Sequence, residues 1–258
     1  DPFWFKWGAL NNVTLGYGGL LSGYSNMMEF PSVRKVGINT GIGFGNFGTE
    51  LFLSNMKDFT RGGTLMGLRG TYKLSDAIPL TFGLNFVMDM NQFSGLKDTD
   101  DDTYPDIFDD FPNNKDYWND TDGDGIADFN GGNKPPATGW DIDGDGDNIL
   151  DSLKDPTLKP TPFSLKDNKA TAQGFAFDLG YPVVKSKAFS LEAYMEYNKL
   201  IFPKIKGDNY YSRKAMNGTG ITIPGVRASV FSFLNVSFEY RLKNGYFAPQ
   251  FFDGSYDL

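Results

Sequence analysis

The sequence predicts an all-β fold of antiparallel strands interrupted by one long acidic segment. Three observations lead to this prediction. Apolar and polar residues alternate with a period of two along most of the 258 residues, helical periodicity is nearly absent, and 17 aspartates are confined to residues 98–151. A period of two places successive side chains on opposite faces of a strand, so the alternating stretches indicate strands with one apolar and one polar face.

Nine stretches show this alternation, and a further stretch is a candidate tenth strand. The nine are centred on residues 13–17, 36–44, 47–54, 66–74, 80–91, 175–181, 189–197, 219–228 and 234–242, and the candidate tenth is 246–256. In the fifth stretch, six apolar residues share one face over about 11 residues, which matches one bilayer crossing. In the eighth, Pro224-Gly225 predicts a bulge or kink.

Two further patterns favour a membrane barrel. Long and short connections alternate along the chain, as they do in transmembrane barrels. Aromatic residues near strand ends match the aromatic girdles of such barrels: Phe44, Phe47, Phe93, Phe189 and Phe202. We therefore predict an antiparallel transmembrane-type β-barrel of about nine or ten strands, or part of a larger barrel. Alternation alone does not tell which face is inside, so a water-soluble β-sandwich or barrel is the alternative.

The polar face of the predicted strands carries nine charged residues. They are Glu50, Arg69, Lys73, Asp89, Asp178, Glu192, Glu196, Glu239 and Arg241. In a membrane barrel these residues face the lumen, where they line a channel or pair with one another and fill it.

Composition excludes several functional classes. The chain has no cysteine and no histidine, which removes thiolate metal sites, disulfides and the usual general base. We therefore predict that the protein is not an enzyme. The net charge of −8 is unevenly distributed, because residues 98–151 sum to −15 and the remainder to +7. Such an acidic block attracts divalent cations and repels nucleic acid, so no nucleic-acid partner is predicted.

The acidic segment contains three clusters with the spacing of a cation-binding loop. Aspartates at every second position curl around a hard cation, glycine permits the tight turn, and a backbone carbonyl adds an oxygen. All-oxygen sites suit Ca²⁺ rather than zinc or copper. The predicted ligands are Asp98, Asp100, Asp102, Asp106 and Asp109, then Asp120, Asp122, Asp124, Ile126 and Asp128, then Asp141, Asp143, Asp145, Asp147, Ile149 and Asp151. The alternative is a disordered acidic loop with weak cation binding.

The repeated pattern D-x-D-x-D-G-x-x-D, together with Phe111-Pro112, resembles thrombospondin type-3 repeats over roughly residues 98–155. The sequence lacks the bidentate Glu and the flanking helices of an EF-hand. With strands on both sides of the insert, the chain resembles a bacterial outer-membrane β-barrel protein with such repeats in an extracellular loop. In the outer-membrane protein A family these repeats link the barrel to a periplasmic domain. In this chain they lie within the strand order, so that role does not carry over.

The resemblance implies an organisation and a function. Residues 1–96 and 161–258 supply barrel strands, and residues 97–160 form the calcium-binding insertion. We expect a non-enzymatic pore, receptor or structural anchor in the bacterial outer membrane, with the calcium-stabilised loop facing the cell exterior. Its partners are the lipid bilayer, calcium ions, and other subunits or the remaining strands of a larger barrel. The second interpretation is a secreted or surface calcium-dependent adhesin or matrix β-protein.

Overall fold

The computed structural model describes residues 2–28, 30–31, 34–129, 131–150, 163–205, 213–231 and 233–256. The chain forms two compact units. The first, which we call the sheet unit, comprises Asp1–Gln92, Thr171–Pro203 and Ala215–Leu258. The second, which we call the acidic unit, comprises Phe93–Ala170 and Lys204–Lys214.

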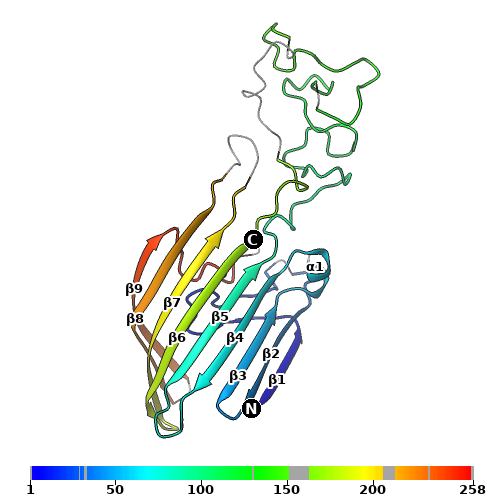
Figure 1. The fold of residues 1–258 in the computed structure, drawn as a ribbon. Coiled ribbons are helices and arrows are strands. Elements are labelled where there is room, and N and C mark those ends of the chain that lie inside the picture. The colour runs from blue at the N-terminus through cyan, green and yellow to red at the C-terminus, as the bar shows by residue number, and fades with distance from the viewer. Residues whose placement is uncertain are drawn as a thin grey trace. The chain divides into compact units, whose positions relative to one another are not determined.

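The sheet unit is built on one sheet of nine antiparallel strands, which confirms the predicted all-β class (Figure 1). The strands lie in the sheet in their order along the chain. They are β1 (Phe3–Gly8), β2 (Gly37–Phe44), β3 (Phe47–Leu53), β4 (Leu65–Lys73), β5 (Thr81–Asp89), β6 (Ala172–Lys185), β7 (Phe189–Phe202), β8 (Met216–Val230) and β9 (Leu234–Gly245). A short helix, α1 (Met56–Arg61), follows β3. Across the part of the chain that is described, no helix has the length and apolar character needed to cross a membrane.

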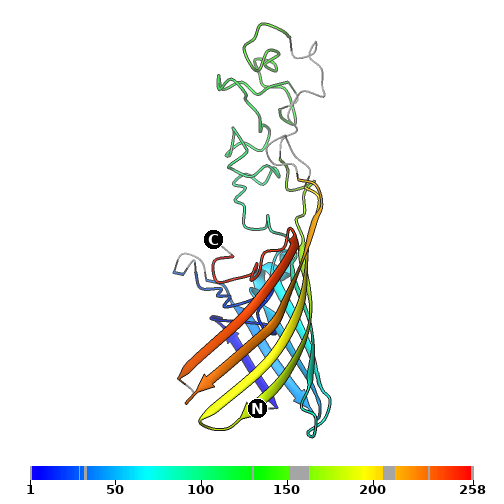
Figure 2. The same ribbon diagram turned by 90° about the vertical axis from the view of Figure 1, so that its left-hand side faces the viewer.

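The sheet does not close into a barrel. Within the described residues, β1 is paired with β2 alone and β9 with β8 alone. Because neighbouring strands run in opposite directions, β1 and β9 run in the same direction. The predicted barrel closure is therefore not formed by these residues, whose strands make a curved open sheet (Figure 2).

Short and long connections alternate, as the sequence predicts. Residues 45–46, 74–80, 186–188 and 231–233 connect strands at one end of the sheet, and residues 9–36, 54–64, 90–171 and 203–215 connect them at the other. The long connection 90–171 joins β5 to β6 and contains most of the acidic unit. Every long connection follows an odd-numbered strand, so all the long connections leave the sheet at the same end.

The register between β4 and β5 shows how alternation separates the two faces. Leu68 pairs with Phe86, and the next residues, Arg69 and Asn85, pair with each other on the opposite face. Asn85 is buried, whereas Leu68 is 47% exposed. We call the face with Arg69 and Asn85 the inner face and the face with Leu68 the outer face. In β8, the register shifts between Thr222 and Gly225, which confirms the predicted bulge.

Two predicted strands are wrong, and one strand was not predicted. Residues 13–17 and 246–256 do not join the sheet, although Leu21 and Phe252 form an isolated bridge. Their alternating apolar residues instead pack against the inner face, which also gives a period of two. The sheet begins with β1, whose sequence Phe-Trp-Phe-Lys-Trp is apolar at four of five positions, so no alternation reveals it.

The core of the sheet unit lies between the inner face and the two segments 9–26 and 246–256 (Figure 2). The segments contribute Leu10, Val13, Leu15, Leu20, Leu21, Tyr24, Phe247 and Phe252, and the strands and adjoining residues contribute Phe52, Leu65, Val87, Ala172, Ala176, Leu200 and Phe202. Backbone hydrogen bonds also join the segments to each other, since Ser22 donates to Phe252 and Phe252 donates to Leu20. The middle of the inner face is therefore covered by the chain's own residues, whereas inner-face residues of β8 and β9 line an open cavity.

Candidate functional site

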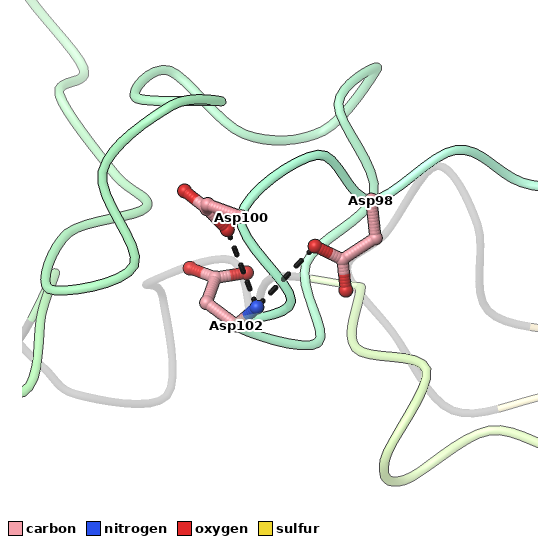
Figure 3. Close-up of side chains that lie close together, drawn as sticks. All are labelled: Asp98, Asp100 and Asp102. Atoms are coloured by element: carbon pink, nitrogen blue, oxygen red, sulfur yellow. Dashed lines mark hydrogen bonds between the residues drawn. The ribbon is translucent and has the colours of Figure 1, made fainter.

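The acidic unit brings together three triplets of aspartates, each with the same spacing. In each triplet, carboxylate oxygens of the first, third and fifth residues lie within 4.8 Å of one another. The triplets are Asp98, Asp100 and Asp102; Asp120, Asp122 and Asp124; and Asp143, Asp145 and Asp147. We call the segments that begin at Asp98, Asp120 and Asp143 the first, second and third loops, and Figure 3 shows the first triplet. Asp151, another predicted ligand, lies outside the described residues.

The three loops are closed by the same pair of hydrogen bonds. The Oδ2 atom of the first aspartate accepts from the backbone N–H five residues later, at 2.9 Å in every loop: Asp98 from Thr103, Asp120 from Gly125, and Asp143 from Asn148. The fifth residue accepts from the N–H of the seventh at 2.7 to 2.8 Å: Asp102 from Tyr104, Asp124 from Ile126, and Asp147 from Ile149. The carboxylates are thus held by local backbone donors.

The backbone conformation repeats as well. The fourth and sixth residues of each loop have positive φ, and in the second loop these are Gly123 and Gly125. The first loop makes the same turns with Asp101 and Thr103, at φ values of 61° and 84°. Positive φ is unfavourable for a β-branched residue such as threonine, so the sequence gives little indication of the turn there.

The seventh position was only partly predicted. Ile126 and Ile149 occupy it in the second and third loops, where their N–H groups donate to the fifth aspartate. Tyr104 occupies it in the first loop and was missed, although its spacing from Asp98 could have identified it. Cation binding by the carbonyl groups at this position stays a prediction.

The ninth residue has a structural role in the first two loops. Asp106 accepts hydrogen bonds from the N–H and hydroxyl of Thr99, both at 2.7 Å, and Asp128 accepts from the same groups of Thr121 at 3.1 and 2.6 Å. Hydrogen bonds from Lys97 and Thr99 lower the pKa of Asp106 to about 2. The structure places these two predicted ligands outside the triplets, where they tie the end of each loop to its start.

The Oδ1 atom of Asp141 accepts from the N–H of Asp143 at 3.0 Å, so Asp141 adjoins the third loop as well as the second. The third triplet begins at Asp143, and Asp141 forms an isolated bridge with Asp128 of the second loop. Its charge also acts on Asp122. Asp141 therefore adds negative charge near the second loop rather than completing the third triplet.

The first loop contains buried carboxylate oxygens that lack a described donor. Asp109 is 7% exposed, and its Oδ1 atom accepts from the N–H of Phe111 at 2.7 Å. The Oδ2 atoms of Asp100, Asp102 and Asp109 are buried and accept no hydrogen bond from any described residue. Burial, with the charges of neighbouring aspartates, raises the pKa of Asp102 and of Asp109 to about 6. Buried, unsatisfied carboxylate oxygens are costly, and an oxygen-binding cation would satisfy them.

The inner face of the sheet carries a second set of charged groups, and these are paired. Arg69 donates to both oxygens of Asp178, at 2.5 and 3.0 Å, and Asn85 donates to Asp178 at 2.8 Å. Asp178 is fully buried. Nearer β9, Glu239 accepts from Tyr194 and Arg241. Two ion pairs thus lie on the inner face, Arg69 with Asp178 and Arg241 with Glu239.

The outer face is apolar and exposed along all nine strands. Its exposed residues include Phe3, Phe5, Trp7, Ile42, Phe44, Phe47, Leu51, Leu68, Tyr72, Leu84, Phe175, Phe177, Tyr181, Phe189, Tyr197, Ile221, Leu234, Val236, Phe238, Tyr240 and Leu242. Leu84 is 66% exposed, whereas Asn85 beside it is 5% exposed. In β5, the polar side chain is therefore covered and its apolar neighbour is uncovered.

No protein-family model, curated protein or solved structure matches the chain. Inference about function therefore rests on two features of the molecule, the aspartate loops and the apolar outer face.

Proposed function

We propose that the chain is a non-enzymatic outer-membrane β-barrel protein with a calcium-stabilised extracellular loop. The observation that carries the membrane part is the inversion of the sheet: apolar residues are exposed on the outer face, whereas Asp89, Asp178 and Glu196 are buried on the inner face. A soluble protein rarely exposes a continuous apolar surface across a whole sheet, because doing so costs hydration free energy. Hydrocarbon is the solvent in which this surface is favourable.

Strand length agrees with this proposal. β4 and β5 have nine residues each, and β6 and β7 have 14. A strand tilted by about 45° crosses the hydrocarbon core of a bilayer with about 9–11 residues. The sheet is therefore long enough to cross, and the alternation of short and long connections matches the two sides of such barrels.

A barrel requires strands in addition to these nine. Backbone groups at the edges of β1 and β9 cannot remain unpaired in hydrocarbon. Because β1 and β9 run in the same direction, an all-antiparallel closure needs an odd number of further strands. A second copy of the chain, inserted in the same orientation, would not supply antiparallel partners. Its edge strands would run parallel to β1 and β9. We therefore propose strands of a larger barrel, or of a different subunit, as the partner of the two edges.

The covered middle of the inner face favours an anchor or receptor over an open pore. Segments 9–26 and 246–256 form a packed core against part of the inner face, where Arg69 pairs with Asp178 and Arg241 with Glu239. Water-filled channels need a lumen lined by solvated polar residues. We propose that the strands hold a filled scaffold and that the acidic unit is the part offered to the exterior.

Calcium is proposed as the ion of the acidic unit. The donor set is composed of carboxylates, which suits a hard cation, and residues 98–151 carry a surplus of 15 negative charges. A bound divalent cation would relieve the repulsion among these charges. The aspartates of the three triplets would hold it, and its role would be structural.

Cysteine labelling in proteoliposomes tests the membrane proposal. The chain has no native cysteine, so Leu84→Cys, on the outer face, can be compared with Ile78→Cys, in the short β4–β5 connection. Both native side chains are more than half exposed in the protein itself. We expect a water-soluble maleimide to label Ile78→Cys and to leave Leu84→Cys unlabelled until the vesicles are dissolved. Equal labelling, from a protein that is soluble without detergent, would instead support the secreted calcium-dependent adhesin or matrix protein.

A further inference from the structure

The three loops differ at their twelfth position. Counted from the first aspartate, this position is Asp109 in the first loop, Gly131 in the second and Lys154 in the third. In twelve-residue calcium loops, the residue at this position supplies the carboxylate that closes the coordination sphere. By this count, the first loop is the one of the three that has a carboxylate at its twelfth position.

Asp109 lies outside the group of carboxylates within 4.8 Å of one another, but it is a buried carboxylate near that group. Its side chain is more than nine-tenths buried, and its Oδ2 atom accepts no hydrogen bond from the described residues. The charges that act on it, apart from the adjacent Asp110, belong to Asp102 and Asp100. The Oδ2 atoms of these two residues are likewise buried without a donor among the described residues. The first loop thus holds three buried carboxylate oxygens without a described donor, on Asp100, Asp102 and Asp109.

The other two triplets are more open to water. All three aspartates of the first triplet are half-buried, whereas Asp122, Asp124, Asp145 and Asp147 are exposed. Asp141 adds a charge near Asp122, but Asp122 itself is exposed and water can share its solvation. Calcium affinity rises with the number of charged ligands and with the rigidity of the site. The differences in burial and in ligand number therefore both favour a higher calcium affinity in the first loop.

We infer that Asp109 is the fourth carboxylate ligand of the first loop and that this loop binds calcium more tightly than the other two. This inference rests on the proposed calcium function. The first loop fills at the lowest calcium concentration. The second and third loops fill afterwards, as weaker sites.

Calorimetric titration of the full chain in detergent, after removal of divalent ions, tests this order. We expect at least two classes of calcium site in the native protein. Asp109→Asn should weaken the tight class by at least roughly tenfold, since even residues outside the first coordination shell contribute 10- to 100-fold to metal affinity. The asparagine can still accept from the N–H of Phe111, so the turn is retained.

Asp101→Asn is the matched control. Asp101 lies between two triplet members, carries the same charge and is exposed. We expect this variant to keep the tight class, because its carboxylate is not part of the triplet. An unchanged tight class in Asp109→Asn, or an equal loss in both variants, would overturn the inference. Absence of calcium uptake by the native protein would overturn the proposed calcium function itself.

Terbium luminescence at low terbium concentration, where the first loop is expected to fill first, gives a second measurement. Tyr104 donates its N–H to Asp102 and its ring stacks on Trp118, with ring centroids 4.5 Å apart. Terbium bound in the first loop should therefore be excited through these rings. We expect Asp109→Asn to lose this emission at low terbium concentration and Asp101→Asn to retain it. Circular dichroism should show the same β-structure in both variants, and retained emission in Asp109→Asn would count against the inference.

Discussion

The sheet unit and the acidic unit treat their buried carboxylates in opposite ways. In the sheet, Asp178 is buried but accepts hydrogen bonds from Arg69 and Asn85. In the acidic unit, Asp102 and Asp109 have buried oxygens that face other aspartates and no described donor. An unpaired buried charge is strongly destabilising, whereas a paired one is tolerated. Asp178 in the sheet is therefore neutralised within the chain, whereas our calcium proposal supplies the positive charge for Asp102 and Asp109 from outside it.

The two units also differ in how much apolar core supports them. Fifteen buried apolar residues form the cluster between the sheet and its inner segments. In the described part of the acidic unit the cluster consists of Phe163, Ala170 and Ile205, with a few partly buried neighbours. A segment with so little core cannot offset the entropy of ordering its backbone by apolar burial alone. This comparison predicts that calcium matters for one unit and not for the other.

The largest effect is expected from removing one member of the buried pair in the sheet. Arg69→Ala would leave the Asp178 carboxylate buried with only Asn85 as a donor, so the sheet unit should lose roughly 3–5 kcal/mol of unfolding free energy. Denaturant unfolding in detergent, followed by the β-signal, measures this loss.

Lys73→Ala is its control, since Lys73 contacts Asp76 at the same 2.5 Å distance but Asp76 is 96% exposed. Surface pairs contribute roughly 0–1 kcal/mol. Similar losses in the two variants would show that burial of the pair does not determine its importance.

A smaller effect is expected where the inner segments rest on the sheet. A Cβ atom added at Gly218 would meet the backbone of Tyr246 and Phe247, whereas one added at Gly70 meets nothing within 4 Å. Overpacking of this kind costs roughly 1–3 kcal/mol. We expect Gly218→Ala to lower the unfolding midpoint of the sheet unit and Gly70→Ala to leave it near the native value. A stable Gly218→Ala variant would mean that residues 246–256 are not held against the sheet.

The acidic unit should respond to pH in opposite directions with and without calcium. The pKa values of Asp102 and Asp109 are raised to about 6, above the ordinary value of 3.8. Without calcium, the folded unit binds protons more readily than the unfolded chain, so its stability falls as pH rises through 6. With calcium the cation must displace those protons, so binding weakens as pH falls, by about tenfold per carboxyl group between pH 7 and 5. Limited proteolysis at both pH values measures the two trends, and identical trends would exclude a role for these carboxylates.

The predictable strands are those in which apolar side chains lie on one face of the sheet and polar side chains on the other. β5 alternates apolar outer residues with polar inner ones, so its period of two identifies it. Residues 13–17 have the same period but lie on the inner side, because an irregular segment can also bury every second side chain. β1 is apolar on both faces and gave no signal. The sequence did not predict whether the polar or the apolar face lies inside, because both arrangements give the same alternation.

In the acidic unit, spacing alone predicted which aspartates gather into triplets. It did not predict that Asp106 closes its loop by hydrogen bonds to Thr99, because that role depends on the conformation of the loop. It grouped Asp141 with Asp143, which donates its N–H to Asp141, but it did not show that Asp141 also bridges to Asp128 of the second loop. Burial of Asp109 depends on the packing around the first loop, which no local spacing reveals.

The most direct measurement of the difference between the units is limited proteolysis and circular dichroism of the detergent-solubilised protein, first with calcium and then with excess chelator. We predict that chelation exposes cleavage sites between residues 98 and 151 while the β-signal and its thermal midpoint stay unchanged. If the β-signal is lost together with calcium, the sheet unit is not independently stable. If the acidic unit stays resistant in chelator, calcium does not hold it together. Either result would contradict a self-sufficient sheet unit that carries a calcium-dependent acidic unit.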